Sequence, residues 1–251
     1  MDYGLIGTEL SHSLSPRIHQ WLGNYDYELV PLTSDQLEPF LVQKDFLGIN
    51  VTIPYKQIAL TLCDTVSPTA ERCSAVNTII KYDDGFLCGY NTDYAGFNYL
   101  LEHFGYNLNR KKILVLGNGG AAHTIRTVAQ DKGAGVIIMA SRQGRINFEN
   151  LYQFNGFQVI INATPLGMSP DDAAPVDLTQ FPHCQLVLDL VYSPQTRLLQ
   201  DAKNLGIACS DGLAMLVAQA KQSSDLFLNM TRSDHLIDQI YQQLIAELDL
   251  S

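Results

Sequence analysis

A glycine-rich run in the middle of the chain has the residue types and spacing of a dinucleotide-binding turn. An apolar segment, residues 112–116, leads directly into Gly117-Asn118-Gly119-Gly120-Ala121-Ala122. Gly117 permits a tight turn, Gly119 lets the backbone approach a pyrophosphate, and Ala122 lets the following helix pack closely on the strand. The start of that helix offers free N–H groups and a positive dipole end to phosphates. The G-x-G-x-x-A pattern between a strand and a helix therefore predicts dinucleotide binding.

The residues after the next apolar segment bear on which dinucleotide binds. Enzymes that use NAD usually carry Asp or Glu about 20 residues after the turn, where it binds the ribose 2′-hydroxyl. Here the segment 136–140 ends in Ser141-Arg142-Gln143-Gly144-Arg145, without a carboxylate. The guanidinium groups of Arg142 and Arg145 could instead clamp a 2′-phosphate. The alternative is that both are solvated surface residues, but in a chain of net charge −10 a local positive pair favours NADP over NAD.

Four polar clusters stand at the ends of apolar segments in the first part of the chain. They are Ser11-His12-Ser13-Leu14-Ser15-Pro16, Asn50-Val51-Thr52-Ile53-Pro54-Tyr55-Lys56, Ala75-Val76-Asn77-Thr78 and Asn91-Thr92-Asp93. Ligand sites in open α/β sheets lie beyond the carboxyl ends of the strands, where these clusters fall. They offer hydroxyls, amides, one cation and one carboxylate. That inventory suits a small, polyhydroxylated ligand that has a carboxylate of its own.

Short apolar strands alternate with helical patterns, which is typical of an α/β protein with parallel sheets. Strands are predicted at residues 3–7, 27–31, 47–52, 76–82, 86–88, 112–116, 136–140, 159–162, 186–190 and 207–210, with a hairpin around 83–85. Helices are predicted from residue 15, at 54–62 and 92–104, after the glycine-rich turn to residue 132, and at 213–228 and 234–248. The pattern predicts a substrate domain at residues 1–98, a Rossmann-type dinucleotide domain at 99–212 and a helical tail at 213–251.

Composition excludes several other classes of protein. The net charge of −10 and the lack of a basic patch argue against nucleic-acid binding. No apolar run approaches the roughly 18 residues that a membrane span needs, and the start of the chain does not look like a signal peptide. The five cysteines are scattered, odd in number and without CxxC spacing, which predicts reduced thiols and no metal site. We therefore expect a cytoplasmic enzyme.

The polar clusters also resemble, in type and order, the motifs of one known family. S-x-S-P, N-V-T-x-P-x-K, A-V-N-T and N-T-D-x-x-G occur in turn, with Gly96 completing the last. The second half continues with the glycine-rich turn, then N-A-T-P-L-G-M at residues 162–168, D-L-V-Y-S-P at 189–194 and G-L-A-M-L at 212–216, with Gln219 after it. Over nearly its whole length the chain is similar to the shikimate dehydrogenase family. The resemblance implies the reversible, NADPH-dependent reduction of 3-dehydroshikimate to shikimate, in the pathway to chorismate and the aromatic amino acids.

The resemblance also implies roles for single residues of the substrate domain. Ser13 and Ser15 would bind the substrate carboxylate, with Tyr192 nearby. The substrate's ring hydroxyls would be bound by Thr52, Asn77, Asp93 and Gln219. Lys56 and Asp93 would be the catalytic pair. The helical tail would return to complete the first domain.

Elementary chemistry agrees with the roles of Lys56 and Asp93. Reduction of a ketone by hydride leaves an alkoxide that needs a proton, so an acid must lie within about 2.6–3.2 Å of that oxygen. Lys56 falls in the first turn of a predicted helix, where the dipole disfavours a cation, and the anionic Asp93 opposes that effect if it lies close. We predict Lys56 as the immediate donor and Asp93 as the residue that orients it and the substrate, with Asp93 as the alternative donor.

For the cofactor, the resemblance extends the set of predicted contacts. The full set is Gly117, Asn118, Gly119, Gly120, Ala121, Ser141, Arg142, Arg145, Asn162, Thr164, Met168, Val191, Gly212 and Met215. Asn162, Thr164, Met168, Gly212 and Met215 would lie along the nicotinamide half. The chain departs from the family's usual N-R-T segment, since Ser141-Arg142-Gln143 keeps only the arginine. The adenine-side contacts are therefore less defined than the phosphate contact.

Two other functions compete with this interpretation. One is a quinate/shikimate dehydrogenase that uses NAD, against which the paired serines and the two arginines argue. The other is a non-catalytic regulator that binds NADP(H) on the same fold, which the retention of both Lys56 and Asp93 disfavours. The expected partners are the small-molecule substrate and, as an open alternative, a second copy of the chain in a homodimer.

Overall fold

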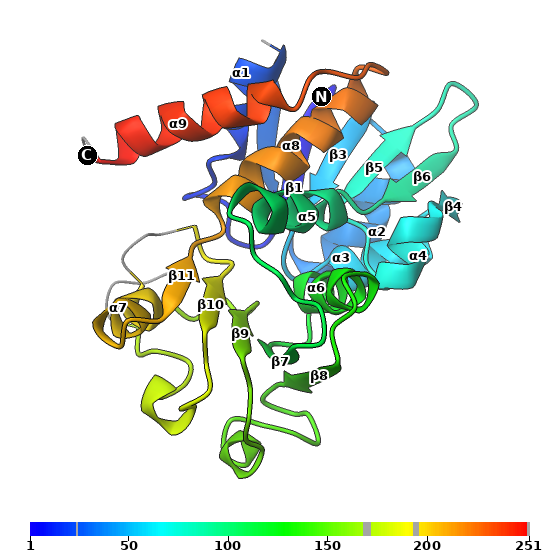
Figure 1. Cartoon of the computed structure of the whole chain (residues 1–251). Helices are drawn as coiled ribbons and strands as arrows, with labels where there is room; N and C mark the ends of the chain where they lie inside the picture. The colour runs from blue at the N-terminus through cyan, green and yellow to red at the C-terminus, as the bar shows by residue number, and fades with distance from the viewer. Residues whose placement is uncertain (24, 168–171, 193–195, 250–251) are drawn as a thin grey trace. The chain divides into compact units, whose positions relative to one another are not determined.

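The structure is a computed structural model that describes residues 1–23, 25–167, 172–192 and 196–249 (Figure 1). The chain divides into two compact units. Unit 1 comprises Met1–Tyr99 and Leu216–Ser251, and unit 2 comprises Leu100–Met215. The predicted domain boundaries stand at 98/99 and 212/213. Helices α5 (Asp93–His103) and α8 (Leu213–Phe227) cross from one unit into the other.

Unit 1 is built on a mixed six-stranded sheet. Its strands are β1 (Tyr3–Gly7), β2 (Tyr27–Pro31), β3 (Gly48–Val51), β4 (Thr65–Val66), β5 (Thr78–Lys81) and β6 (Leu87–Tyr90), in the order β2-β1-β3-β5-β6-β4. The first three strands are parallel, in a register that pairs Tyr3 with both Tyr27 and Gly48. Strand β5 runs antiparallel to β3 and to β6. The predicted hairpin is therefore confirmed, and it makes this sheet mixed.

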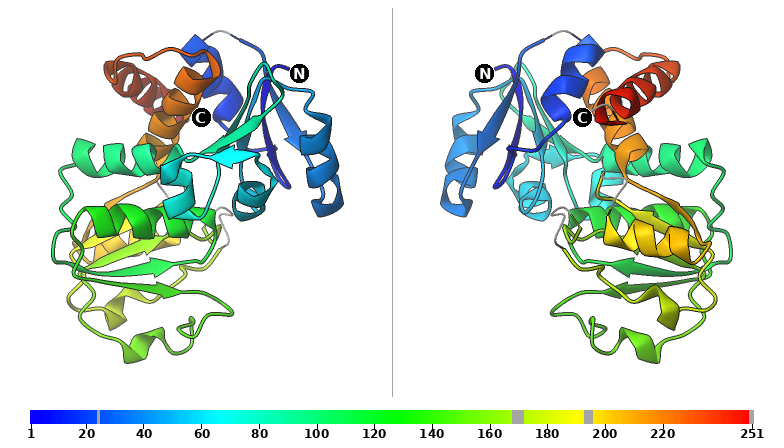
Figure 2. Two further views of the ribbon diagram at one scale, coloured as in Figure 1. Left: turned by 90° about the vertical axis from the view of Figure 1, so that its right-hand side faces the viewer. Right: turned by 90° about the vertical axis from the view of Figure 1, so that its left-hand side faces the viewer.

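The helices of unit 1 bury apolar faces against this sheet and against one another. Besides α5 and α8 they are α1 (Ser15–Gly23), α2 (Ser34–Gln43), α3 (Lys56–Leu62), α4 (Pro68–Cys73) and α9 (His235–Asp249). Side chains of α2, such as Leu37 and Leu41, join Ile49 of β3 in one buried core. Helix α9 lies against α1 (Figures 1 and 2). The return of the last helices to the first unit, which the resemblance implies, is therefore confirmed.

Unit 2 is built on a parallel five-stranded sheet. Its strands are β7 (Lys112–Leu116), β8 (Val136–Ala140), β9 (Val159–Asn162), β10 (Leu186–Asp189) and β11 (Ala208–Ser210), in the order β11-β10-β9-β7-β8. Helix α6 (Gly120–Asp131) packs against β7 and β8, and α7 (Arg197–Asn204) packs against β10 and β11. Two short 3-10 turns, Leu151–Gln153 and Leu178–Gln180, complete the unit.

The strand order of unit 2 reverses between β7 and β9, and such a reversal is the place where open α/β sheets bind ligands. The register pairs Leu116 with Ala140 on one side and with Asn162 on the other. Asn162 is in turn paired with Asp189. The carboxyl ends of four strands are therefore level, and the segments that follow them emerge together at one edge of the sheet.

Several described elements lie outside the predicted ones, namely α2, α4, α7, the two-residue strand β4 and the two 3-10 turns. The predicted helix from residue 54 begins at Lys56. The other predicted strands and helices are confirmed, with their ends shifted by two residues or fewer.

Candidate active site

Lys56 and Asp93 lie in direct contact in unit 1. The Lys56 Nζ atom donates to Asp93 Oδ2 over 2.6 Å, and the two side chains are 15% and 6% exposed. Each residue begins a helix, Lys56 that of α3 and Asp93 that of α5. An ammonium group and a carboxylate that touch in a nearly closed environment can hold a proton at a defined place and pass it to a third oxygen.

Asn77 and Gln219 lie beside this pair in one hydrogen-bonded network. The Thr92 backbone N–H donates to Asn77 Oδ1 over 2.7 Å, which ties Asn77 to the residue that precedes Asp93. Asn77 Nδ2 donates to Thr92 Oγ1 over 2.9 Å and, more weakly, to Gln219 Oε1 over 3.4 Å. Gln219 comes from α8, far along the chain. Two predicted substrate-binding amides are thus brought together next to the predicted catalytic carboxylate.

The centre of this network is a residue that the sequence analysis does not single out. Ser223 Oγ lies 2.8 Å from Asn50 Nδ2, 2.9 Å from Thr78 Oγ1 and 3.0 Å from Thr92 Oγ1. Its side chain is fully buried. Asn50, Thr78 and Thr92 stand inside the motifs already quoted. Ser223 follows Gln219 by four residues and so shares its helix face, which is the signal that could have found it.

The predicted carboxylate-binding serines lie at the start of α1. Ser13 Oγ accepts the backbone N–H of Ser15 over 3.2 Å, and Ser15 is buried. Thr52 follows β3, and its methyl carbon would lie 2.5 Å from a Cβ added at Gly7. In the part of the chain that the structure describes, no side-chain hydrogen bond joins Ser13 or Thr52 to Lys56 or Asp93.

The glycine-rich turn of unit 2 has the conformation that a dinucleotide needs. Gly117 has a φ of +120°, in the region that favours glycine, and an added Cβ would lie 3.0 Å from Ala163 O. Gly119 is the N-cap of α6 and makes no side-chain cap hydrogen bond, and a Cβ added there would meet nothing within 4 Å. Because this backbone is bare and open, the residues present fit a bound pyrophosphate.

The other predicted residues of the turn form the first turn of α6. Gly120 and Ala121 open the helix, and Ala122 is fully buried, as close packing on β7 requires. Asn118 Oδ1 and His123 Nε2 lie 3.1 Å apart, so these two side chains bracket the turn. Burial lowers the pKa of His123, and the nearby Arg126 lowers it further.

The segment after β8 forms a closed turn that presents two cations. The Ser141 backbone N–H donates to Ile146 O and the Gly144 N–H donates to Ser141 O, both over 3.1 Å. Arg142 and Arg145 are exposed. Within the described ranges neither guanidinium is paired with a carboxylate. Two unpaired cations at the end of the second strand fit a 2′-phosphate.

The predicted cofactor-binding residues that follow β9 and β10 are fixed by hydrogen bonds within the protein. Asn162 is fully buried, and its Oδ1 accepts both the backbone N–H of Thr164 over 3.1 Å and the hydroxyl of Thr164 over 2.6 Å. Val191 donates its N–H to Asp189 Oδ1 over 3.2 Å. Burial raises the pKa of the Tyr192 phenol. These residues begin the two segments that follow β9 and β10 at one edge of the sheet.

Gly212 and Met215 flank the start of α8. A Cβ at Gly212 would lie 2.3 Å from Leu190 O, so only glycine fits beside that strand end. Met215 is buried. The predicted cofactor residue Met168 lies outside the described residues.

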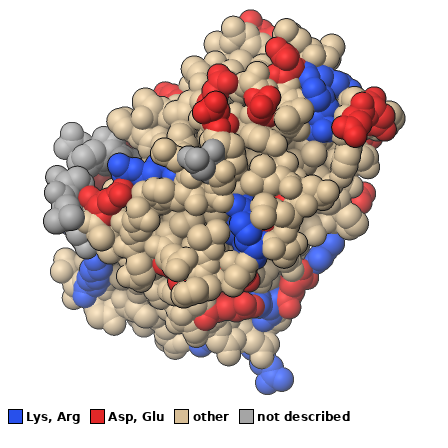
Figure 3. All heavy atoms as spheres, turned by 90° about the horizontal axis from the view of Figure 1, so that it is seen from above, with Lys and Arg blue, Asp and Glu red and all other residues tan. Residues whose placement is uncertain are grey.

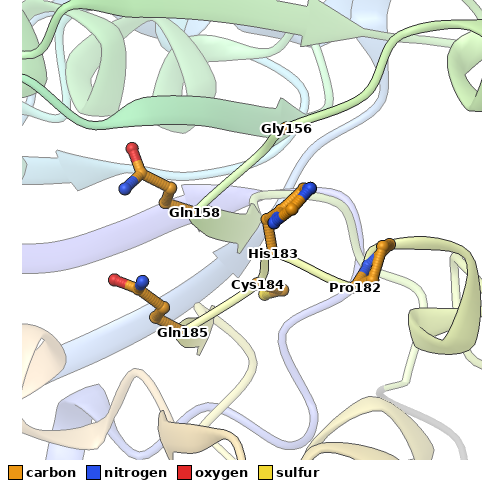
Figure 4. Close-up of a pocket in the computed structure, with 6 residues that line it drawn as sticks. All are labelled: Gly156, Gln158, Pro182, His183, Cys184 and Gln185. Carbon is orange, nitrogen blue, oxygen red and sulfur yellow. The ribbon is translucent and has the colours of Figure 1, made fainter.

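A cavity of about 390 Å³ in unit 2 lies at the other edge of the sheet (Figure 4). It is lined by Gly156, Gln158, Pro182, His183, Cys184 and Gln185. Gln158 and Gln185 each stand just before a strand, β9 and β10, whereas the glycine-rich turn follows the carboxyl end of β7. This cavity is therefore separate from the candidate dinucleotide site.

The surface carries charges of both signs. Figure 3 shows acidic and basic side chains interspersed on one face, without a continuous basic area. None of the helices in the described part of the chain is both long and apolar enough to cross a membrane.

Comparison with known proteins gives consistent matches. A family model described as the shikimate dehydrogenase substrate binding domain matches residues 5–79. A curated shikimate dehydrogenase (NADP(+)) from Clostridium beijerinckii is 35% identical over 261 residues, covering 95% of this chain and 96% of that protein. One from Clostridium perfringens is 34% identical, covering 96% of this chain and 97% of the other.

Solved structures give the same result. Shikimate dehydrogenase 1 from Peptoclostridium difficile superposes with a TM-score of 0.91 at 32% identity, covering 98% of this chain and 99% of that one. Shikimate 5-dehydrogenase from Thermus thermophilus, solved in complex with NADP(H) and shikimate, has a TM-score of 0.83 at 29% identity and covers 97% of this chain and 99% of that one.

Proposed function

The chain belongs to the shikimate dehydrogenase family, and from that premise we propose how its own residues carry out the reaction. Its activity is the reversible, NADP-dependent interconversion of 3-dehydroshikimate and shikimate, an oxidoreductase reaction of the shikimate pathway. The 2.6 Å contact between Lys56 Nζ and Asp93 Oδ2 is the main observation that supports these two residues as the catalytic pair.

Lys56 and Asp93 carry out the proton transfer. NADPH, when bound, would supply the hydride that reduces the substrate ketone. Lys56 donates a proton from Nζ to the resulting alkoxide, and Asp93 holds the ammonium group in place through Oδ2. In the reverse direction Lys56 takes the hydroxyl proton. A residue that gives and takes this proton needs a fixed position rather than a free, solvated side chain, and the low exposure of both groups provides it.

The polar network of unit 1 orients the substrate. We assign binding of the substrate's ring hydroxyls to Thr52, Asn77, Asp93 and Gln219. Amide and carboxylate groups that neighbouring residues hold in place can form hydrogen bonds only with hydroxyls at matching positions. Ser13 and Ser15 bind the substrate carboxylate through their hydroxyls. Tyr192, in unit 2, is assigned to the same carboxylate on the family resemblance.

The cofactor is held by backbone and by cations of unit 2. The free N–H groups of Gly119, Gly120 and Ala121 bind the pyrophosphate, and Gly117 and Asn118 shape the turn. Ser141, Arg142 and Arg145 bind the 2′-phosphate. The nicotinamide half is assigned to Asn162, Thr164, Met168, Gly212 and Met215, and Val191 is a further cofactor contact.

Two further predictions concern the protein in its cell. We propose a cytoplasmic location, which the free cysteines Cys63, Cys73, Cys88, Cys184 and Cys209 support because reduced thiols persist there. A homodimer stays an open alternative to a monomer, and sedimentation equilibrium would decide between them.

The test is the rate of NADP reduction with shikimate and, in parallel, with quinate. We expect a fast reaction with shikimate and a much slower one with quinate, since the site offers donors and acceptors at fixed positions. Comparable rates with both acids would instead support a quinate/shikimate dehydrogenase. Binding of NADP without turnover of either acid would overturn the proposal in favour of a regulator.

A further inference from the structure

Asp189 is a buried carboxylate for which the proposed reaction has no use. It is the last residue of β10 and is fully buried. Three donors converge on it. Asn162 Nδ2 donates to Oδ1 over 2.8 Å, the Val191 N–H donates to Oδ1 over 3.2 Å, and the Thr196 hydroxyl donates to Oδ2 over 2.8 Å.

Each donor fixes a different segment of the same sheet edge. Asn162 links Asp189 to the loop after β9. Its side-chain amide donates to Leu166 O over 3.1 Å, and its Oδ1 accepts from both the backbone N–H and the hydroxyl of Thr164. Val191 belongs to the loop after β10. Thr196 caps α7 by accepting the N–H of Leu199 over 3.3 Å. One carboxylate therefore ties two loops and a helix start together.

The position of these loops follows from the topology of unit 2. The adenosine half of the cofactor is assigned to the end of β8, and the pyrophosphate to the turn after β7. Because β9 and β10 lie on the other side of β7 in the sheet, the nicotinamide half must extend over their carboxyl ends. The loops that Asp189 ties together are the ones that the nicotinamide half would meet.

We propose that Asp189 is a positioning residue for the nicotinamide half of the cofactor. It acts through Asn162, Val191 and Thr196, which hold the described residues that directly follow β9 and β10, 163–167 and 190–192, in the conformation that binds the ring. The inference rests on the proposed function, and it adds a residue that makes no contact with substrate or cofactor itself.

The carboxylate form suits this role. All three neighbours are donors, and only an ionised carboxylate can accept from all of them without offering a proton of its own. Burial raises the pKa of Asp189, and the nearby Asp211 raises it further, whereas the hydrogen bonds from Thr196, Asn162 and Val191 lower it. The three hydrogen-bond donors therefore offset part of the cost of burying the charge. Without the carboxylate these hydrogen bonds are lost, and we expect both loops to become less ordered.

Three variants separate positioning from stability. Asp189→Ala removes all three contacts. Asp189→Asn keeps an acceptor for Asn162 and Val191 and can turn its amide toward Thr196, whose hydroxyl can rotate to accept. Val187→Ala, two residues earlier on the same strand and fully buried, is the matched control that creates a core cavity away from the loops.

The experiment compares two ligands by calorimetric titration. Adenosine 2′,5′-bisphosphate carries the 2′-phosphate half only, while NADPH carries both halves. For Asp189→Ala we expect the Kd of NADPH to rise at least tenfold and that of the bisphosphate to stay within twofold. Asp189→Asn should fall between Asp189→Ala and wild type, which also tests the inference if the alanine variant does not fold. In turnover, the Michaelis constant for NADP should rise more than that for shikimate.

Equal losses for both ligands, or the same pattern in Val187→Ala, would show that Asp189 acts through stability alone and would overturn the inference. Wild-type affinity for NADPH in both Asp189 variants would overturn it as well. Failure of the proposed function looks different, because then the wild-type protein itself would not bind the bisphosphate or reduce NADP with shikimate.

Discussion

The two units prepare for their ligands in opposite ways. Around Asp93 in unit 1, the site consists of hydrogen-bonded side chains: Lys56 pairs with Asp93, and Asn77 and Ser223 both bond to Thr92, the residue before Asp93. At the turn after β7 in unit 2, the site consists of backbone, and a Cβ added at Gly119 would meet open space. The first region fixes donors and acceptors in advance, whereas the second offers backbone N–H groups that make no hydrogen bond to a side chain of the described residues.

The difference follows from what each ligand demands. A proton must pass between defined atoms, so small errors in position cost much of the rate. A pyrophosphate needs only converging N–H groups and close access to the backbone. Substitutions should therefore act on turnover in unit 1 and on cofactor affinity in unit 2.

The largest effect is expected for Lys56→Ala. Removal of the proton donor should lower turnover about a hundredfold or more, because general acid catalysis contributes roughly 10²–10⁴-fold. Affinity for NADPH, measured by fluorescence titration, should change little. The control is Lys44→Ala, since Lys44 also pairs with a carboxylate, Asp64, but in an exposed position. Turnover within about tenfold of wild type, or ~1.4 kcal/mol, would show that Lys56 is not the donor.

Next in size is an effect of acid on unit 1 through His19. Its ring is buried and stacks on Tyr27 at 4.0 Å, and burial lowers its pKa to about 3. The folded state thus binds fewer protons than the unfolded state, in which the pKa is near 6.5, and stability falls as the pH drops below 6.5. Between pH 7 and pH 5 this costs about 2 kcal/mol.

Urea unfolding of wild type and His19→Phe at both pH values measures this effect. The variant should lose most of the pH dependence, while substitution of the exposed His183 by Gln should leave it unchanged. If the free energy of unfolding of His19→Phe depended on pH as that of wild type does, another residue would cause the acid sensitivity.

In unit 2, Gly119→Ala should separate binding from folding. The added methyl group meets no protein atom within 4 Å, so the melting temperature should stay near that of wild type. It stands where the backbone must approach the pyrophosphate, so NADPH affinity should fall about tenfold or more, ~1.4 kcal/mol. Gly117→Ala is the contrasting variant, because its positive φ and its contact with Ala163 predict a loss of stability. Normal NADPH binding by Gly119→Ala would disprove close approach at this residue.

The smallest effect is expected for Arg142→Ala. Loss of an exposed guanidinium should raise the Michaelis constant for NADP about five- to tenfold through lost charge-assisted hydrogen bonds, and that for NAD much less. Arg197→Ala is the control, since Arg197 is an exposed surface residue bonded to Asp201. Equal changes for both cofactors would rule out recognition of the 2′-phosphate by Arg142.

Local signals explain which parts of the fold could be predicted. Ser15-Pro16 marks the start of α1 and the glycine-rich run marks the turn, because each acts over a few residues. The same kind of signal was present for α4 in Ser67-Pro68 and for α2 in Thr33, whose N–H donates to the Gln36 side chain over 2.9 Å. Pro39 within α2 interrupts its helical pattern. Strand β4 has two residues, too few for any periodicity.

The contacts within the candidate sites could not be predicted from local sequence signals. The contact between Lys56 and Asp93 joins residues 37 positions apart, and no local pattern encodes it. Its prediction came from the family resemblance. The roles of Ser223 and Asp189 depend on which strands and helices become neighbours, so they emerge only from the three-dimensional structure.

The most direct test of the account is the initial rate of nicotinamide reduction with shikimate, measured in parallel with NADP and NAD at matched concentrations. We predict a fast reaction with NADP and a rate with NAD at least tenfold lower, because two arginines that pair with no carboxylate among the described residues follow β8, where NAD enzymes carry a carboxylate. Comparable rates would contradict the assignment of the 2′-phosphate to those arginines, and no reaction with either cofactor would contradict the function itself.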